Sequence, residues 1–419
     1  MTPSGPTRRG LLTGAAVVGA AGLGAGGAAV AQARTSPEAP AGATVPFHGA
    51  RQAGITTPAQ DQLVFAALDV TTTDAGELAD VLARWSEAAA TMATGAHLGR
   101  GAGIAEGADE PPVDTGEAFE LPAANLTVTL GYGPSLFDGR FGLQDKRPAA
   151  LEELPALPGD QLDPTRCGGD LCLQACADDP QVAFHAVRNL VRIGRGVVAV
   201  RWMQLGFGRT STTSTTQSTP RNLMGFKDGT ANLRAEQTAD VDRFVWVGGE
   251  GAPAVDQEWM RGGTYLVARR IRMLIESWDR AVLAEQERVI GRAKQSGAPL
   301  SGTHEFDALD LAKRDASGKP VIDAAAHVRL AAPESNGGQK LLRRGYSYTD
   351  GLDPVTGQLD AGLFFICFQN DPERQFVAIQ RRLGAHDGLT EYLKHTGSAI
   401  FACPPGIDAD GRWGAELFT

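Results

Sequence analysis

The sequence predicts an α+β fold in which two ferredoxin-like domains, each with an antiparallel sheet, follow one another as a tandem duplication. Two segments carry this prediction, because each reads as a buried strand, a turn and an amphipathic helix that begins at Asp-Pro. The first contains Asp179-Pro180 and the second contains Asp371-Pro372. Proline suits the first turn of a helix, where the N–H that it lacks would have no partner. The recurrence of the same strand-turn-helix pattern in both halves of the chain implies two structurally similar domains.

The remaining hydrophobic patterns add further elements to each half. We expect strands at residues 63–70, 126–132, 169–176, 197–205, 264–271, 361–368 and 399–402, and helices at residues 75–91 and 274–294. Each half then has the β-α-β…β-α-β order of a ferredoxin-like unit, with helices on one face of its sheet. The predicted domains are residues 58–222 and 223–419, and residues 95–120 and 210–219 are expected to be exposed loops.

Length, charge and cysteine content narrow the class of protein. The 419 residues suit two domains after removal of a leader, and 42% hydrophobic with 21% charged residues is ordinary for a globular protein. The formal net charge of -10 disfavours a nucleic-acid partner, since phosphate backbones would be repelled. The five cysteines form no CxxC pair, which argues against a zinc site. We expect Cys172 and Cys176 to be buried as small hydrophobic residues.

Residues 1–33 have the pattern of an export signal. Arg8 and Arg9 precede a mildly apolar run, and Ala31-Gln32-Ala33 is a small-x-small cleavage site. We expect a twin-arginine signal peptide, so that the twin-arginine export machinery is a partner and the protein works in the periplasm, at the cell envelope or as a secreted protein. The alternative is an uncleaved transmembrane helix, which the glycine content of the run disfavours. Residues 34–57 would form a linker and an N-terminal arm.

The segment at residues 222–232, NLMGFKDGTAN, is the most specific signal in the chain. Alone, it reads as a turn, because Asp and Gly favour one. Two later segments change that interpretation: AHVRL at residues 326–330 and LRRGY at residues 342–346. Together with residues 47–55 and 395–401, they resemble the dye-decolorizing (DyP-type) peroxidase family, in its twin-arginine-exported, deferrochelatase-like branch. The resemblance covers residues 46–407, and one departure is Arg51, where this branch often carries His.

The resemblance implies one haem b per chain, bound in the C-terminal half. It makes His327 the proximal ligand of the haem iron, through a neutral imidazole nitrogen. It places Asp228 and Arg343 on the distal side, with Arg343 also in contact with the haem. The backbone at Gly229, Thr230 and Ala231 would pass close to the porphyrin, where glycine permits a close approach. Leu363 and Phe365 would cover the distal face, although an ordinary core position explains them equally well.

These residue types suit peroxide chemistry. A base must move a proton from the near oxygen of hydrogen peroxide to the far one so that water leaves, and Asp228 can serve both halves of this transfer. Arg343 stays cationic and stabilises the negative charge that develops as the O–O bond breaks. Because an unperturbed aspartate has a pKa of about 3.9, a carboxylate base stays competent in acid. We therefore predict an acidic pH optimum.

The implied substrates are hydrogen peroxide and a one-electron reducing donor, such as a dye or a phenolic compound. Large donors would not reach a buried haem, so Trp or Tyr side chains near the surface would have to relay electrons. Tyr346 and Tyr348, which follow Arg343 closely, are the candidates, and a plain core role is the alternative.

A second function stays open beside the peroxidase. The same resemblance points to components of iron-uptake systems that release iron from haem and leave the porphyrin intact, so that haem is the substrate. A third reading, a ferredoxin-like binding module without haem, requires His327, Asp228 and Arg343 to coincide by chance. The oligomeric state is left open, and a homo-oligomer is compatible with paired ferredoxin-like units.

Overall fold

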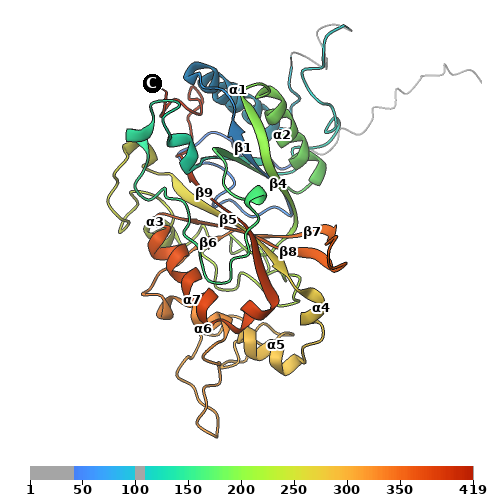
Figure 1. The fold of residues 1–419 in the computed structure, drawn as a ribbon, viewed down its shortest axis with the longest axis vertical. Helices are drawn as coiled ribbons and strands as arrows, with labels where there is room; N and C mark the ends of the chain where they lie inside the picture. Colours follow the sequence, from blue (N-terminus) through green and yellow to red (C-terminus); the bar gives the residue numbers. More distant parts are fainter. Residues whose placement is uncertain (1–41, 100–108, 419) are drawn as a thin grey trace, which may run out of the picture. The chain divides into compact units, whose positions relative to one another are not determined.

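The computed structural model describes residues 42–99 and 109–418 (Figure 1). The strands are β1 (Gln62–Val70), β2 (Thr127–Tyr132), β3 (Leu171–Ala177), β4 (Val198–Arg209), β5 (Thr264–Met273), β6 (Leu342–Arg343), β7 (Tyr346–Leu352), β8 (Leu359–Gln369) and β9 (Leu393–Cys403). The α-helices are α1 (Ala75–Ala93), α2 (Pro180–Ile193), α3 (Thr238–Phe244), α4 (Ile275–Trp278), α5 (Leu283–Ile290), α6 (His327–Ala331) and α7 (Ala378–His386). The predicted signal peptide lies outside the described residues. Within the part of the chain that is described, no helix is long and apolar enough to cross a membrane.

Two four-stranded antiparallel sheets, which together with the short β6 form one continuous nine-stranded sheet, have the same strand order. In the first sheet the order is β4-β1-β3-β2, and in the second it is β9-β5-β8-β7. In each case the first and third strands of the unit lie in the centre, which is the ferredoxin-like order. The prediction of an α+β fold made of two duplicated ferredoxin-like units is therefore confirmed.

The two sheets join at both edges and enclose a core between them. β2 pairs with β9 at Tyr132 and Ala402, and β4 pairs with β7 at Phe207 and Ser347. Apolar side chains of both sheets fill the interior, including Phe65, Tyr346, Phe364, Ile366 and Phe401. Cys172 and Cys176 lie in this core as free thiols, as the sequence predicted.

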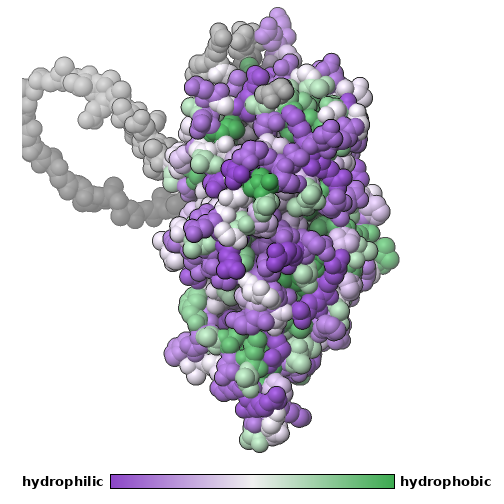
Figure 2. Space-filling view, turned by 90° about the vertical axis from the view of Figure 1, so that its left-hand side faces the viewer, coloured by the Kyte–Doolittle hydropathy of each residue, from purple (hydrophilic) through white to green (hydrophobic). Residues whose placement is uncertain are grey.

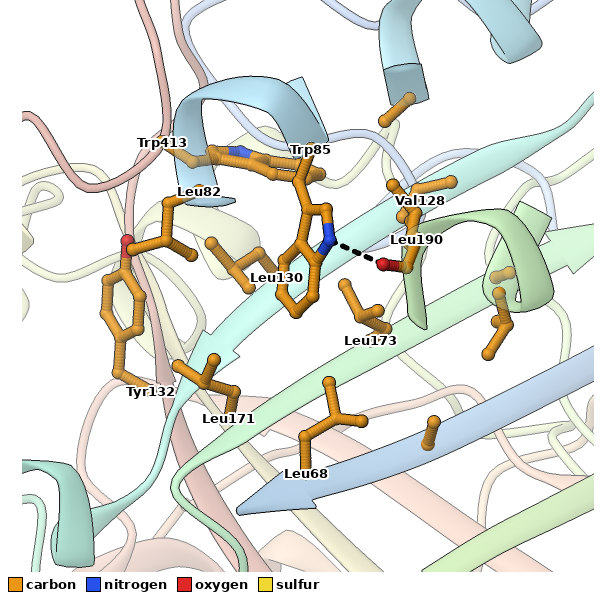
Figure 3. Packing of buried hydrophobic residues seen from close by; sticks show 14 of the residues in the cluster. Leu68, Leu82, Trp85, Val128, Leu130, Tyr132, Leu171, Leu173, Leu190 and Trp413 are labelled. Atoms are coloured by element: carbon orange, nitrogen blue, oxygen red, sulfur yellow. Dashed lines mark hydrogen bonds between the residues drawn. The ribbon is translucent and has the colours of Figure 1, made fainter. Parts of the chain in front are cut away.

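Helices α1 and α2 cover the outer face of the first sheet (Figure 3). Asp179 caps α2 by accepting hydrogen bonds from the backbone of Gln181 and Val182, so this Asp-Pro element forms as predicted. Trp85 of α1 is completely buried, and its indole N–H donates to the Leu190 carbonyl of α2 at 2.6 Å. This hydrogen bond connects the two helices where they pack on the sheet. By contrast, the face of the molecule in Figure 2 is largely hydrophilic, with hydrophobic residues in small separate groups.

The helix predicted at residues 274–294 is wrong as a single element. It is divided into α4 and α5, because Val282 is extended and Gly291 ends α5 in the left-handed conformation at φ +89°. Trp278 anchors the break, since its indole N–H donates to the Met224 carbonyl at 3.0 Å. The side chain of Gln286 donates to the Trp278 and Ala281 carbonyls, both at 3.0 Å, and so bonds α5 to the residues before the break.

The second Asp-Pro helix forms with a different start. A π-helical turn at Glu373–Val377 precedes α7, and the Asp371 side chain accepts from the backbone N–H of Arg374 at 3.0 Å. π-helical turns often occur at functional sites because they shift the direction of side chains. Here Phe376, Ile379 and Leu383 line one cavity.

Both segments predicted as exposed loops are exposed only in part. Residues 210–214 are buried rather than solvated, and Thr213 donates to the Thr57 carbonyl at 2.7 Å. The Ser214 hydroxyl donates to the Glu236 carboxylate at 2.7 Å, so that these two buried hydroxyl groups have partners inside the protein. In the segment 95–120, residues 100–108 lie outside the described residues, but Asp114 is buried and accepts from the Leu98 backbone N–H at 2.8 Å.

Candidate active site

A large cavity lies between the outer face of the second sheet and the helices α6 and α7. It contains about 1720 Å³ of empty space, counting the open solvent at its mouth. Its walls are mainly apolar and include Ile271, Leu363, Phe365, Leu383 and Leu393. Each predicted site residue lines this cavity: Asp228, Gly229, Thr230, Ala231, His327 and Arg343. Residues far apart in the sequence therefore converge on one space.

His327 stands at the first position of α6 with one ring nitrogen already engaged. Its Nδ1 lies 2.6 Å from Oδ2 of Asp387, whose side chain is 3% exposed. Burial lowers the pKa of His327, but the charge and hydrogen bond of Asp387 outweigh burial and raise the pKa above its ordinary value. With Nδ1 held by a carboxylate, Nε2 is the nitrogen that remains for a metal in the cavity.

The side chain of Asp387 is fixed by the backbone of the short helical turn that follows it. Its other oxygen accepts the backbone N–H of Leu389 at 2.9 Å, at the start of the short 3₁₀ turn Gly388–Tyr392. The carboxylate therefore has a fixed direction toward His327. Sequence reasoning left this partner unidentified, because 60 residues separate it from His327 and no local pattern marks it.

Asp228 and Arg343 form an ion pair that faces the cavity. Nη1 of Arg343 donates to Oδ1 of Asp228 at 2.7 Å, and the amide of Asn222 donates to Oδ2 at 3.1 Å. Both partners keep partial access to the cavity, with side chains 15% and 27% exposed. Since each oxygen of the carboxylate has one donor, its orientation is fixed while lone pairs remain for a further proton.

Asn232 places Arg343 through the backbone. Its side-chain amide donates to the Arg343 carbonyl at 2.8 Å, and its side-chain oxygen accepts the Arg343 N–H at 2.8 Å. This residue closes the segment 222–232, so the motif supplies both the carboxylate and the clamp for the arginine. The sequence contained Asn232, but only the fold shows what it holds.

The glycine of the motif is needed for a reason in addition to the predicted one. Gly229 adopts φ +93°, and a Cβ there would lie 2.9 Å from Cα of Ser211. Any larger residue would therefore be strained and would collide with the buried segment 210–214. This packing positions the turn that carries Asp228.

Glu305 secures the same turn from the opposite side and was not identified from the sequence. Its carboxylate bonds to the ammonium of Lys227 and accepts from the Thr230 hydroxyl at 3.2 Å. These two residues flank Asp228 and its neighbour Gly229. The loop that carries Glu305 is thus bonded to the turn on either side of Asp228 and Gly229.

Tyr346 and Tyr348 do not lie where the relay hypothesis needs them. Both are completely buried in the core between the two sheets rather than near the surface, and neither lines the cavity. They alternate with Ser347 on β7, so both side chains point inward. The premise of a surface position is wrong, and an electron-relay role for either residue stays a prediction. Arg51, the departure noted in the sequence, packs over the Trp246 ring at 4.8 Å and is not among the cavity residues.

The cavity has the properties that a haem site requires. It is large and mostly apolar, it presents one carboxylate-oriented histidine, and it presents an Asp–Arg pair suited to peroxide. An imidazole ligand whose second nitrogen is fixed by a carboxylate is a common arrangement at metal sites. Fold and site together define a haem peroxidase.

Comparison with known proteins identifies the family. Residues 52–208 match the model of the Dyp-type peroxidase N-terminal domain, and residues 219–408 match that of the C-terminal domain. The chain belongs to the Dyp-type peroxidase family. It is a peroxidase of the oxidoreductase class, and it binds haem b as its cofactor.

Curated relatives and solved structures agree with this assignment. Deferrochelatase of Yersinia pestis is 40% identical over 96% of this chain and 92% of its own length, and deferrochelatase of Escherichia coli K12 is 38% identical over 98% and 97%. Ferric DtpA from Streptomyces lividans superposes with a TM-score of 0.81 at 40% identity, covering 92% of this chain and 99% of that chain. A DyP-type peroxidase from Cellulomonas bogoriensis gives 0.79 at 39% identity, with 90% and 99% coverage.

Proposed function

We propose that this enzyme uses Asp228 to transfer the proton of hydrogen peroxide, Arg343 to stabilise developing negative charge, and His327 to hold the haem iron. The observation that carries the proposal is the convergence of the Asp228–Arg343 and His327–Asp387 pairs on one cavity. Gly229, Thr230 and Ala231 would supply the backbone beside the porphyrin. Leu363 and Phe365 line the same cavity from β8, as expected for residues that cover the distal face.

The proposed reaction uses the two charged groups in sequence. Asp228 accepts a proton from hydrogen peroxide and returns it to the departing oxygen, which leaves as water. Arg343, whose backbone is held by Asn232, would direct its guanidinium at the oxygen that becomes negative as the O–O bond breaks. Haem, when bound, supplies the electrons for this cleavage and recovers them from one-electron donors. We expect the rate to be highest in acid, because a carboxylate rather than a histidine acts as the base.

The first experiment compares absorption spectra of the wild-type protein and His327→Ala, before and after addition of hydrogen peroxide. We expect a Soret band in the wild type that shifts with peroxide, and a weaker or displaced band in His327→Ala. Equal haem content and equal spectra in both proteins would show that His327 is not the ligand. Asp228→Asn is the second arm, in which the Soret band should persist while its response to peroxide slows.

Release of iron from haem is the second candidate function. The relatives named deferrochelatase support this function, because their similarity to this protein extends over nearly the whole chain. Asp228 and Arg343 would have no evident use in a protein that only carried haem. Incubation of the protein with haem, followed by fluorescence detection of free protoporphyrin and a chelator assay for iron, tests this function. Formation of protoporphyrin without peroxide turnover would favour iron release over the peroxidase reaction.

Export by the twin-arginine route is part of the proposal. It is supported by Arg8 and Arg9, the apolar run after them and the cleavage motif ending at Ala33. The enzyme would then act outside the cytoplasmic membrane, where iron-uptake proteins are available as partners. Fractionation of cells that express the wild type or an Arg8→Lys, Arg9→Lys variant tests this. Export of both proteins in equal amounts would contradict the twin-arginine route.

A further inference from the structure

The positively charged side chains of the cavity differ in their partners. Four of them form an ion pair with a carboxylate: Lys227 with Glu305, Arg269 with Asp160, Lys340 with Asp240 and Arg343 with Asp228. Arg292 also lines the cavity, but it forms no ion pair with any carboxylate in residues 42–99 and 109–418. Its positive charge is therefore not balanced by a carboxylate among the described residues, whereas the charges of the other four are.

The surroundings of Arg292 satisfy only part of its guanidinium. The residue follows the C-terminal glycine of α5 and is 7% exposed. Nη1 donates to the carbonyls of Gly297 at 2.7 Å and Glu305 at 3.0 Å. The carboxylate of Glu305 bonds instead to the ammonium of Lys227 and the hydroxyl of Thr230. Backbone carbonyls orient the guanidinium but do not neutralise its charge.

Burial makes this arrangement costly in the absence of an anion. Desolvation lowers the pKa of Arg292, and the charge of Arg343 lowers it further, while Glu305 acts in the opposite direction. A buried cation without a counter-ion loses hydration that only an anion can replace. Two guanidinium groups that repel one another beside an apolar cavity form a place where a carboxylate would be stabilised.

We propose that Arg292 binds a propionate carboxylate of the haem. Haem b is an apolar macrocycle with carboxylates at one edge, so its charge distribution matches an apolar cavity with a buried, unpaired arginine. A planar guanidinium is the side chain best suited to bind a carboxylate through parallel hydrogen bonds. In this assignment Arg292 is a cofactor-binding residue that recognises the haem edge, and it has no part in proton transfer.

The test is a comparison of haem with haem dimethyl ester, in which the carboxylates are esterified and uncharged. Transfer of each compound from the protein to excess apomyoglobin is followed by absorbance for the wild type, Arg292→Met and Arg288→Met. We expect the wild type to lose the ester about 10- to 100-fold faster than haem, as for loss of a charged hydrogen bond. Arg292→Met should reduce this ratio by about tenfold or more. Arg288→Met should keep the wild-type ratio, since Arg288 is half-exposed and pairs with Glu285.

The haem-free protein gives a readout that is independent of activity. If Arg292 is unpaired until haem binds, then Arg292→Met should unfold at the same temperature as the wild type or higher without haem, and at a lower temperature with haem. Arg292→Lys should retain part of the discrimination, because it keeps the charge but not the planar geometry. A wild type that releases haem and its ester at the same rate overturns the proposal without any variant. An Arg292→Met ratio equal to that of the wild type also overturns it. Stabilisation of the haem-free protein by chloride or phosphate that depends on Arg292, with no ester effect, would assign the site to a free anion instead.

Discussion

Replacing Asp387 by Asn tests how the protein controls the electronic properties of the haem iron. The hydrogen bond from His327 is short, at 2.6 Å, and the Asp387 side chain is 3% exposed, so solvent screens it weakly. Asn keeps an acceptor for Nδ1–H and can still cap the backbone at Leu389, but it removes the negative charge. A hydrogen bond to a charged group contributes about 1.5–3 kcal/mol against about 1 kcal/mol for a neutral one. The variant should therefore lose about 1–2 kcal/mol of interaction.

This loss should fall mainly on the ferric state, because a more basic imidazole stabilises the higher charge of the iron. For a one-electron couple a tenfold change corresponds to about 59 mV, so the reduction potential should rise by roughly 40–90 mV. The same loss corresponds to a fall in haem affinity of about 5- to 30-fold. Spectroelectrochemical titration measures the potential, and Asp323→Asn is the control, since Asp323 pairs with Arg288 rather than with His327. If Asp387→Asn keeps its Soret band and its potential equals that of the wild type, then the carboxylate does not set the basicity of His327.

Three other predictions follow from the cavity and the core. Asp228→Asn should lower kcat/KM for hydrogen peroxide by about 10²- to 10⁴-fold while haem content is preserved, as stopped-flow absorbance can determine; a loss below threefold would contradict the base role. Burial, with a contribution from Arg269, lowers the pKa of His395 to about 4. Because an unfolded histidine binds a proton near pH 6.5, this site contributes stability above that pH and loses it as the pH falls to 4, on the order of 3 kcal/mol. His395→Gln should remove this part of the pH dependence in urea unfolding, and an unchanged slope between pH 4 and 6.5 would refute the assignment. Trp85→Phe should destabilise the protein by about 2 kcal/mol through loss of the hydrogen bond to Leu190 and of buried volume; a midpoint of chemical denaturation equal to that of the wild type would show that the helices α1 and α2 are held otherwise.

Local sequence chemistry determined the elements whose signals are contained within a few residues. Asp179-Pro180 sets the start of α2 because the carboxylate accepts the free N–H groups and proline lacks one. The repeat of this pattern was sufficient to predict a duplicated α+β fold. It did not foresee the π-helical turn before α7 or the division of residues 274–294. The division depends on Trp278 and Gln286, whose side chains donate to the carbonyls of Met224 and Trp278.

The sequence by itself determined which residues are able to perform the chemistry: a carboxylate, an arginine and a histidine in three segments that resemble one family. Only the tertiary structure decided what holds them, because Asp387, Asn232 and Glu305 act across 60 to 111 positions of the chain. The structure also decided that Tyr346 and Tyr348 face a closed core and that Arg292 is without a carboxylate partner among the described residues. A residue type states which bonds a side chain can form, whereas the free energy of each bond depends on burial and on the partners that the fold brings within reach.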